Sequence, residues 1–144
     1  MAKRGTLDHP KNLALADDLN VSESWTLGIL SALWEWAANS APTGSLGRTT
    51  PRRIAQICRW PGDPDALLSA LLGRAESAQK AHRERTEGAW LDEVDGDLCI
   101  HDWPDHCDPG VHNFLYRRGM WFADGTKPSP SRLSLDERER CEAL

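Results

Sequence analysis

Side chains that can bind a metal ion are densest between residues 99 and 112. This stretch contains Cys99, His101, Asp102, His106, Cys107, Asp108 and His112. His101 and His106, with Cys99 or Cys107, have the ligand types of a tetrahedral zinc site. Their spacing matches no closed zinc signature, however, and strand alternation places Asp102 on the face opposite Cys99 and His101. We therefore predict no metal and no cofactor, and retain Cys99, His101, His106 and Cys107 as the candidate ligands if a metal is bound.

The same stretch gives little support to a catalytic interpretation. A nuclease built from His101, Asp102, His112 and Asn113 would require a general base, a metal ion and a phosphate clamp, and each of these has to be assumed. The glycine-containing string TGSLGR at residues 43–48 lacks the Lys-Ser/Thr pair of a nucleotide-binding P-loop. No serine or cysteine nucleophile has a visible set of partners. The sequence predicts a protein that is not an enzyme.

Basic side chains are candidates for binding the phosphate groups of DNA. Eight of them surround the segment that begins at Pro51 or mark the charged stretch after residue 73: Arg48, Arg52, Arg53, Arg59, Arg74, Lys80, Arg83 and Arg85. If they converge, they form a phosphate-binding face although the formal net charge is −5. The alternative is a solvated surface with scattered arginines, which Glu76, Glu84 and Glu87 favour in the charged stretch.

Acidic side chains mark a second candidate surface. They lie at the start of a predicted helix and around a predicted β-turn: Asp63, Asp65, Asp92, Glu93, Asp95 and Asp97. Carboxylates at a helix start suit the helix dipole but repel phosphate. Capping and solubility explain these residues most simply, and the alternative is that they face a basic protein partner.

The segment from Trp90 to His106 predicts a β-hairpin. Its two apolar-containing runs flank an Asp-Gly dipeptide at positions 95 and 96, which supplies the positive φ angles of a type I′ turn. Leu91, Leu98 and Ile100 then share one face, and burial of that face fixes the register. The expected pairs are Val94 with Asp97, Leu91 with Ile100, and Trp90 with His101.

Helical patterns lie on both sides of this hairpin. A first helix begins near Pro10, and a strongly apolar one, which includes Trp25, runs from Ser22 to about Ala41 at the expected centre of the domain. Thr50-Pro51 and Asp63-Pro64 each combine a capping residue with a proline at the first helical position, and Asp108-Pro109 starts a further helix. The side chains expected to face inward include Leu13, Ala16 and Leu19, then Ile54, Ile57 and Cys58, then Leu67, Leu68, Leu71 and Leu72, and finally Val111, Phe114, Leu115 and Phe122.

The order of these elements predicts the fold class. Two capped helices joined by about four residues have helix-turn-helix spacing. The short extended link at residues 45–47 is where a winged helix has its small first strand. We therefore expect a mainly α protein with a small β-hairpin, a winged helix-turn-helix with extra N- and C-terminal helices. Trp60 would close the helix-turn-helix, Trp103 would fill the base of the hairpin, and Trp121 is the aromatic residue expected to be most exposed.

Several short strings carry a resemblance to a known family. The strings LDHPK, ALWEWAA, TGSLGR, WPGDPDALLSALL, AWLD and IHDWPDH, in this order, resemble a phage-encoded winged-helix family found among phage and prophage replication initiators and replisome organisers. The resemblance covers roughly residues 6 to 108. It implies a winged-helix fold and a role in the initiation or regulation of DNA replication, and it supplies no catalytic residues. The chain departs from the family in the charged stretch 74–87 and in the apolar string VHNFLYRRGMWF.

Two functional hypotheses follow. The first is a non-enzymatic DNA-binding module of phage or prophage origin, with weak, salt-sensitive binding through the basic residues named above. The second is a protein-interaction adaptor or inhibitor that docks a larger nucleoprotein complex through its acidic residues. A homodimer is compatible with either hypothesis.

Composition limits the remaining possibilities. The 144 residues predict a winged-helix domain over 1–123, followed by a flexible linker and short terminal helix over 124–144. The four cysteines do not have the close spacing of a disulfide framework, which favours reduced thiols. Without a run of about 20 apolar residues or a secretory segment at the start, the chain is expected to be cytoplasmic and not to engage a membrane.

Overall fold

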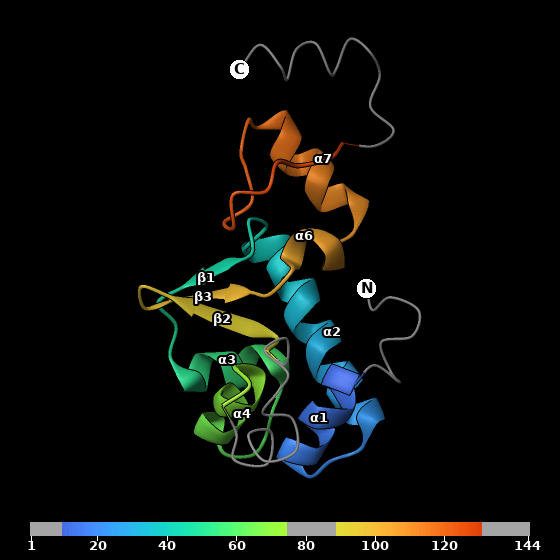
Figure 1. The fold of residues 1–144 in the computed structure, drawn as a ribbon, viewed down its shortest axis with the longest axis vertical. Helices are drawn as coiled ribbons and strands as arrows, with labels where there is room; N and C mark the ends of the chain where they lie inside the picture. Colours follow the sequence, from blue (N-terminus) through green and yellow to red (C-terminus); the bar gives the residue numbers. More distant parts are fainter. Residues whose placement is uncertain (1–9, 75–88, 131–144) are drawn as a thin grey trace.

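The computed structural model describes residues 10–74 and 89–130 (Figure 1). They form a mainly helical protein with one small three-stranded antiparallel sheet, which confirms the coarser expectation of a mainly α protein with a small β part. The elements are α1 (Pro10–Leu19), α2 (Glu23–Ser40), β1 (Ser45–Gly47), α3 (Pro51–Cys58), α4 (Pro64–Leu71), β2 (Leu91–Val94), β3 (Asp97–Ile100), α6 (Trp103–His106) and α7 (Pro109–Arg117).

Helix α2 supplies much of the core. Ser22 caps its N-terminus by accepting a hydrogen bond from the backbone N–H of Trp25. The buried residues of α2 are Thr26, Ile29, Leu30, Leu33, Trp34 and Ala37. Trp25, another apolar residue of this helix, is not buried. Its side chain is 46% exposed, and its ring packs on Trp60, with centroids 5.6 Å apart, instead of entering the core.

Helix α1 buries a face that differs from the predicted one. Leu13 was expected to point inward but is exposed, whereas Leu15 is buried together with Ala16 and Leu19. The reason is Asn12, which is fully buried and accepts a 2.6 Å hydrogen bond from the Thr26 hydroxyl of α2. Positions 12, 15, 16 and 19 form one helical face, and a residue at position 13 lies about 100° away from position 12.

Helices α3 and α4 begin where the sequence predicted. The side chain of Thr50 accepts a hydrogen bond from the N–H of Arg53, and the side chain of Asp63 accepts one from the N–H of Asp65. Ile54, Ile57, Cys58, Leu67 and Leu71 are buried as expected, whereas Leu68 and Leu72 are only partly buried.

The hairpin has the predicted register. Leu91 pairs with Ile100, and Val94 with Asp97. Asp95 and Gly96 both have positive φ, +54° and +87°, as a type I′ turn requires. Strand β1 also pairs with β3, so the sheet order is β1-β3-β2.

A short helix that the sequence analysis did not predict, α6, follows the hairpin. Trp103 at its start is buried, and its indole N–H donates to the Pro42 carbonyl at 2.9 Å. The ring lies so close to Gly44, whose φ is +92°, that a Cβ there would come within 2.8 Å of it. Trp103 therefore fills the base of the hairpin, as expected, and ties it to the segment after α2.

Helix α7 forms one end of the molecule along its longest axis (Figure 1). Val111, Leu115 and Phe122 are buried as predicted, but Phe114 is 39% exposed, which corrects the expectation that it points inward. The guanidinium of Arg118 covers its ring at 4.0 Å. A helix at the end of a molecule has the core on one side only, so its buried face is narrow.

The residues after α7 turn back along it. The N–H of Phe122 donates to Thr126, and the N–H of Ser129 donates to Nδ1 of His112 at 3.0 Å. Residues 124–130, predicted as the start of a linker, therefore contact α7. The domain boundary after residue 123 stays a prediction, and the predicted terminal helix lies outside the described residues.

Candidate functional site

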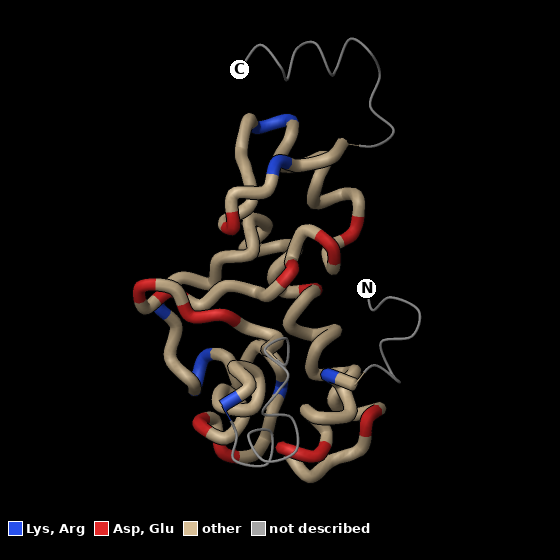
Figure 2. Tube along the Cα trace, in the orientation of Figure 1, with Lys and Arg blue, Asp and Glu red and all other residues tan. Residues whose placement is uncertain are grey.

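The β2–β3 hairpin forms an acidic surface. Asp92, Glu93, Asp95 and Asp97 lie on its strands and turn, and all four are exposed or partly exposed. In the sequence, residues 89–108 contain seven Asp or Glu and no Lys or Arg. Figure 2 shows the acidic positions along the hairpin. We call β2, β3 and their turn the acidic hairpin.

A cavity of about 430 Å³ opens beside the acidic hairpin. Ile100 and Trp103 contribute apolar surface to its wall. Its carboxylates come from three parts of the chain: Asp92, Asp95 and Asp97 of the hairpin, Asp102 before α6, and Asp124 after α7. A concave wall with five carboxylates favours a cationic group, such as a lysine or arginine side chain.

His101 is held between two of these carboxylates. Its Nδ1 lies 2.8 Å from Oδ2 of Asp92, and its Nε2 lies 3.3 Å from Oδ2 of Asp102. Strand alternation was expected to separate Asp102 from His101, and this was wrong, because the strand ends at Ile100 and the chain turns at Asp102 with φ of +54°. A neutral imidazole donates to one of these carboxylates, whereas a protonated one donates to both.

Two of the described cysteines, Cys58 and Cys99, have thiols with little nucleophilic character. Burial raises the pKa of the Cys58 thiol to about 12. Burial, with smaller contributions from Asp97 and Asp92, also raises the pKa of Cys99, although a hydrogen bond with Ser45 opposes the shift. The thiolate is the nucleophilic form. A raised pKa therefore keeps both thiols protonated near neutral pH.

The candidate metal ligands do not form one site. Cys99 and His101 line the cavity, whereas the ring of His106 stacks on Trp34 with centroids 5.0 Å apart. Cys107 is buried, with its Sγ 3.7 Å from the Pro104 carbonyl. Within residues 10–74 and 89–130, no group of three or more His, Cys, Asp or Glu side chains is placed to hold a metal ion.

Two of the predicted DNA-binding arginines contact the acidic hairpin. The Arg48 guanidinium donates to the Asp95 carbonyl at 3.5 Å and lies 3.9 Å from the carboxylate of Asp97. Arg74 lies 3.7 Å from the carboxylate of Glu93. These pairs are exposed, so each is weak, but they offset part of the hairpin's charge.

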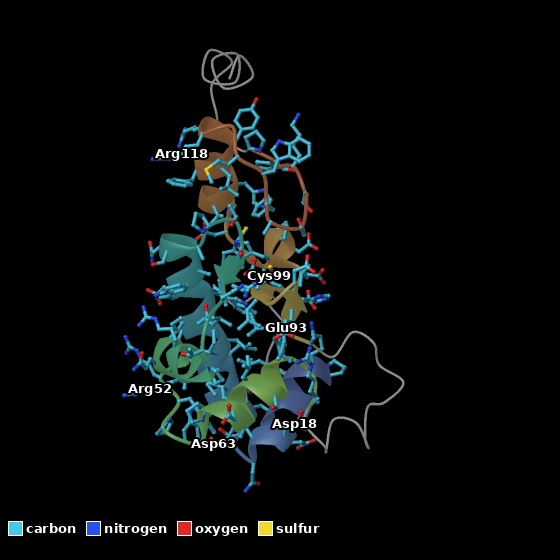
Figure 3. All side chains as sticks on the ribbon, turned by 90° about the vertical axis from the view of Figure 1, so that its left-hand side faces the viewer. Asp18, Arg52, Asp63, Glu93, Cys99 and Arg118 are labelled. Atoms are coloured by element: carbon cyan, nitrogen blue, oxygen red, sulfur yellow. The ribbon has the colours of Figure 1, made fainter. Side chains whose placement is uncertain are left out.

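The other described basic candidates lie around α3. Arg52 and Arg53 are exposed in its first turn, and the Arg53 guanidinium lies over the Trp36 ring at 5.9 Å. Arg59 follows the helix and is also exposed. In Figure 3, Arg52 lies near one edge of the molecule and Glu93 lies toward the other side. The described arginines therefore form two groups, one beside the acidic hairpin (Arg48 and Arg74) and one around α3 (Arg52, Arg53 and Arg59). The remaining candidates, Lys80, Arg83 and Arg85, lie outside the described residues.

Helix α4 presents no basic side chain to solvent. Asp63, Asp65 and Ala66 are exposed at its start, and the sequence contains no Lys or Arg from residue 60 to residue 73. Of the six predicted partner-binding acids, Asp63 and Asp65 lie on this helix, and the other four lie on the hairpin.

Sequence reasoning missed the cavity, and at the end of α7 it predicted the exposure of Trp121 but not that of Phe114. Asp124 reaches the cavity because the N–H of Ala123 donates to the Thr43 carbonyl at 2.9 Å, a contact between distant segments that no local pattern reveals. The end of α7 did carry a visible signal, since Arg117 and Arg118 lie next to each other and Trp121 follows. The exposure expected for Trp121 is confirmed, at 58%.

Comparison with known proteins does not identify a family. No protein-family model, no curated protein and no solved structure matches this chain. None of the helices described is long and apolar enough to cross a membrane. The resemblance to phage-encoded winged-helix proteins accordingly stays a prediction from the sequence.

Proposed function

We propose that this chain is a non-enzymatic winged-helix module that docks a basic protein surface through its acidic hairpin. The element order supports the winged-helix assignment. Helices α3 and α4 are joined by a short turn, β1 precedes them, and a hairpin follows them in a sheet of order β1-β3-β2. This is the arrangement expected of a helix-turn-helix with a wing.

One observation carries the docking proposal: the acidic hairpin and its cavity hold carboxylates that the neighbouring arginines do not balance. The described contacts pair Arg48 with Asp97 and Arg74 with Glu93. Four of the five carboxylates in the cavity wall lie outside these two pairs: Asp92, Asp95, Asp102 and Asp124. The partly exposed ring of His101 lies between Asp92 and Asp102. Complementary charge accelerates encounter with a basic partner and sets its orientation.

The same charges oppose the common mode of DNA reading. A winged helix normally presents the N-terminal part of its second helix-turn-helix helix to the major groove. In this chain that position carries Asp63 and Asp65, and the wing beside it is acidic. Phosphate would be repelled from both.

Neutralisation of the hairpin tests the proposal. The probe is a fluorescein-labelled Lys/Arg-rich peptide, and the variant is Asp95→Asn with Asp97→Asn. We expect the peptide to bind the full-length chain and the variant to bind it about tenfold more weakly, or ~1.4 kcal/mol. The matched control, Asp17→Asn with Glu35→Gln, removes the same charge from exposed positions on α1 and α2. Equal loss in the control, or none in the hairpin variant, would contradict docking at the acidic hairpin.

A second candidate function is supported by α3. Arg52 and Arg53 are exposed at the helix N-terminus, where the helix dipole also favours phosphate. This helix would contact the backbone of duplex DNA with little base readout, as in replication initiation or its regulation. Mobility-shift measurements with mixed duplex at low salt test it. Arg52→Glu with Arg53→Glu should abolish binding, and an unchanged affinity would show that α3 is not the contact.

A further inference from the structure

The end of α7 has the opposite charge from the acidic hairpin. Between residues 109 and 123 the sequence contains Arg117 and Arg118 but no Asp or Glu, and Lys127 follows. Asp124, the first carboxylate after this stretch, lines the cavity beside the hairpin. Figure 2 shows basic positions at this end of the molecule. We call residues 109–123 the α7 end.

Large apolar side chains are exposed at the α7 end. Trp121 is the most exposed large hydrophobic residue of those described, and Phe114 and Met120 are exposed as well. By contrast, Trp34, Trp90 and Trp103 are all buried in the core. The Phe114 ring carries the guanidinium of Arg118 at 4.0 Å, a cation–π contact that leaves the edge of the guanidinium available to an acceptor.

The loop that carries Trp121 is anchored on both sides. The N–H of Met120 donates to the Leu115 carbonyl at 2.9 Å. On the other side, Phe122 is buried, with its ring centroid 4.8 Å from that of His112. The indole is therefore presented to solvent by a fixed backbone, and little ordering would be needed for it to bind a planar group.

We propose that the α7 end binds single-stranded nucleic acid. Trp121 and Phe114 supply the surfaces on which bases stack, and Arg117 and Arg118 contact phosphates. Exposed aromatic rings together with cations are the combination that binds single strands without sequence preference. In a duplex the bases already stack on each other, so duplex DNA would leave Trp121 and Phe114 unused. The proposal does not depend on docking at the acidic hairpin.

Fluorescence anisotropy with a labelled oligodeoxythymidine tests this proposal on the full-length chain. Trp121→Ala should weaken binding about tenfold, because stacking one base on an aromatic ring contributes about 1–3 kcal/mol. Trp121→Phe keeps an aromatic surface and should retain most of the affinity. Since Trp121 is more than half exposed, the thermal unfolding curve of each variant should match that of the parent.

Charge reversal tests the phosphate contacts proposed for Arg117 and Arg118. Arg117→Glu with Arg118→Glu should weaken binding at low salt and reduce the slope of log affinity against log salt by about 1.4, the value for two phosphate contacts on a single strand. The comparison variant is Arg52→Glu with Arg53→Glu, which reverses the same number of charges at α3 and should weaken oligodeoxythymidine binding less than the α7 variant does. It also separates this site from the duplex contact considered for α3.

Four outcomes would overturn the proposal. They are no binding of oligodeoxythymidine at low salt, no loss in Trp121→Ala, equal loss in the α3 control, and displacement of the oligonucleotide by an equal concentration of a poly-glutamate peptide. The last would assign the α7 end to an acidic protein partner instead. None of these outcomes bears on binding of the Lys/Arg-rich peptide, so failure here is distinguishable from failure of hairpin docking.

Discussion

The acidic hairpin and the α7 end contact the same core but differ in charge and in what they expose. The hairpin turns its apolar residues Leu91, Leu98 and Ile100 inward and presents carboxylates. The α7 end exposes Trp121 and Phe114 beside arginines. The net charge of −5 describes neither surface. In a small acidic protein, therefore, the local charge of each surface determines which partners that surface can bind, and the net charge of the whole chain does not.

The largest expected effect concerns the residue between the two regions. Trp103→Ala should destabilise the fold by roughly 3–5 kcal/mol, because it removes a buried aromatic side chain. It also removes the hydrogen bond to Pro42. Urea unfolding measures the change. A loss below about 1 kcal/mol would mean that the hairpin and the segment after α2 hold together without this ring.

A smaller loss is expected at the glycine that packs against this ring. Gly44→Ala should cost roughly 2 kcal/mol, since it combines positive φ with a close contact. The added Cβ would meet Trp103 at 2.8 Å, from a backbone with φ of +92°. Gly125, with φ of +90° and open space around it, provides the control, because Gly125→Ala brings backbone strain without the clash. Equal losses in both variants would show that packing against Trp103 contributes nothing.

Salt should affect the α7 end in a predictable way. Between about 50 mM and 200 mM salt, oligodeoxythymidine affinity should fall about sevenfold if two phosphates are contacted. The Lys/Arg-rich peptide should also bind more weakly, because added salt screens the exposed carboxylates. The two sites should also be independent when each ligand is measured separately. Trp121→Ala should leave peptide affinity unchanged, and a loss of peptide binding in that variant would indicate that the two regions form one site.

The smallest expected effect on stability concerns Arg48, which contacts the acidic hairpin. Arg48→Ala should alter stability by less than about 0.5 kcal/mol, because its ion pair with Asp97 is exposed. Removal of this cation should nevertheless strengthen binding of the Lys/Arg-rich peptide. Weaker peptide binding in this variant would indicate that Arg48 contacts the ligand itself.

Local patterns predicted much of the fold. Alternation and the Asp-Gly turn gave the hairpin register, and the capping residues with proline gave the starts of α3, α4 and α7. Leu13 and Phe114 were assigned to the wrong faces, because apolar character alone does not show which side of a short helix meets the core. Asn12, a polar residue satisfied by Thr26, takes the inward position instead.

The candidate surfaces were less predictable, because they depend on contacts between distant residues. Arg48 meets the hairpin turn 47 positions later in the chain. Asp124 joins the cavity only because Ala123 pairs with Thr43. The sequence grouped Arg48 and Arg74 with the basic candidates, whereas in the fold each contacts a carboxylate of the acidic hairpin. The position of a charged residue in the sequence does not show which other charged residues lie beside it in the fold.

The exposure of Trp121 also has an optical consequence. The indoles of Trp34, Trp90 and Trp103 are shielded from water, whereas Trp121 is exposed on the α7 end, which contains Arg117 and Arg118 but no Asp or Glu. Iodide, an anion, should be concentrated around that ring and quench its emission at the red edge of the spectrum, while caesium should be repelled from it. Because Trp25 is also 46% exposed, the part of this quenching that is lost in Trp121→Phe reports the potential at the α7 end, and no attached dye is needed.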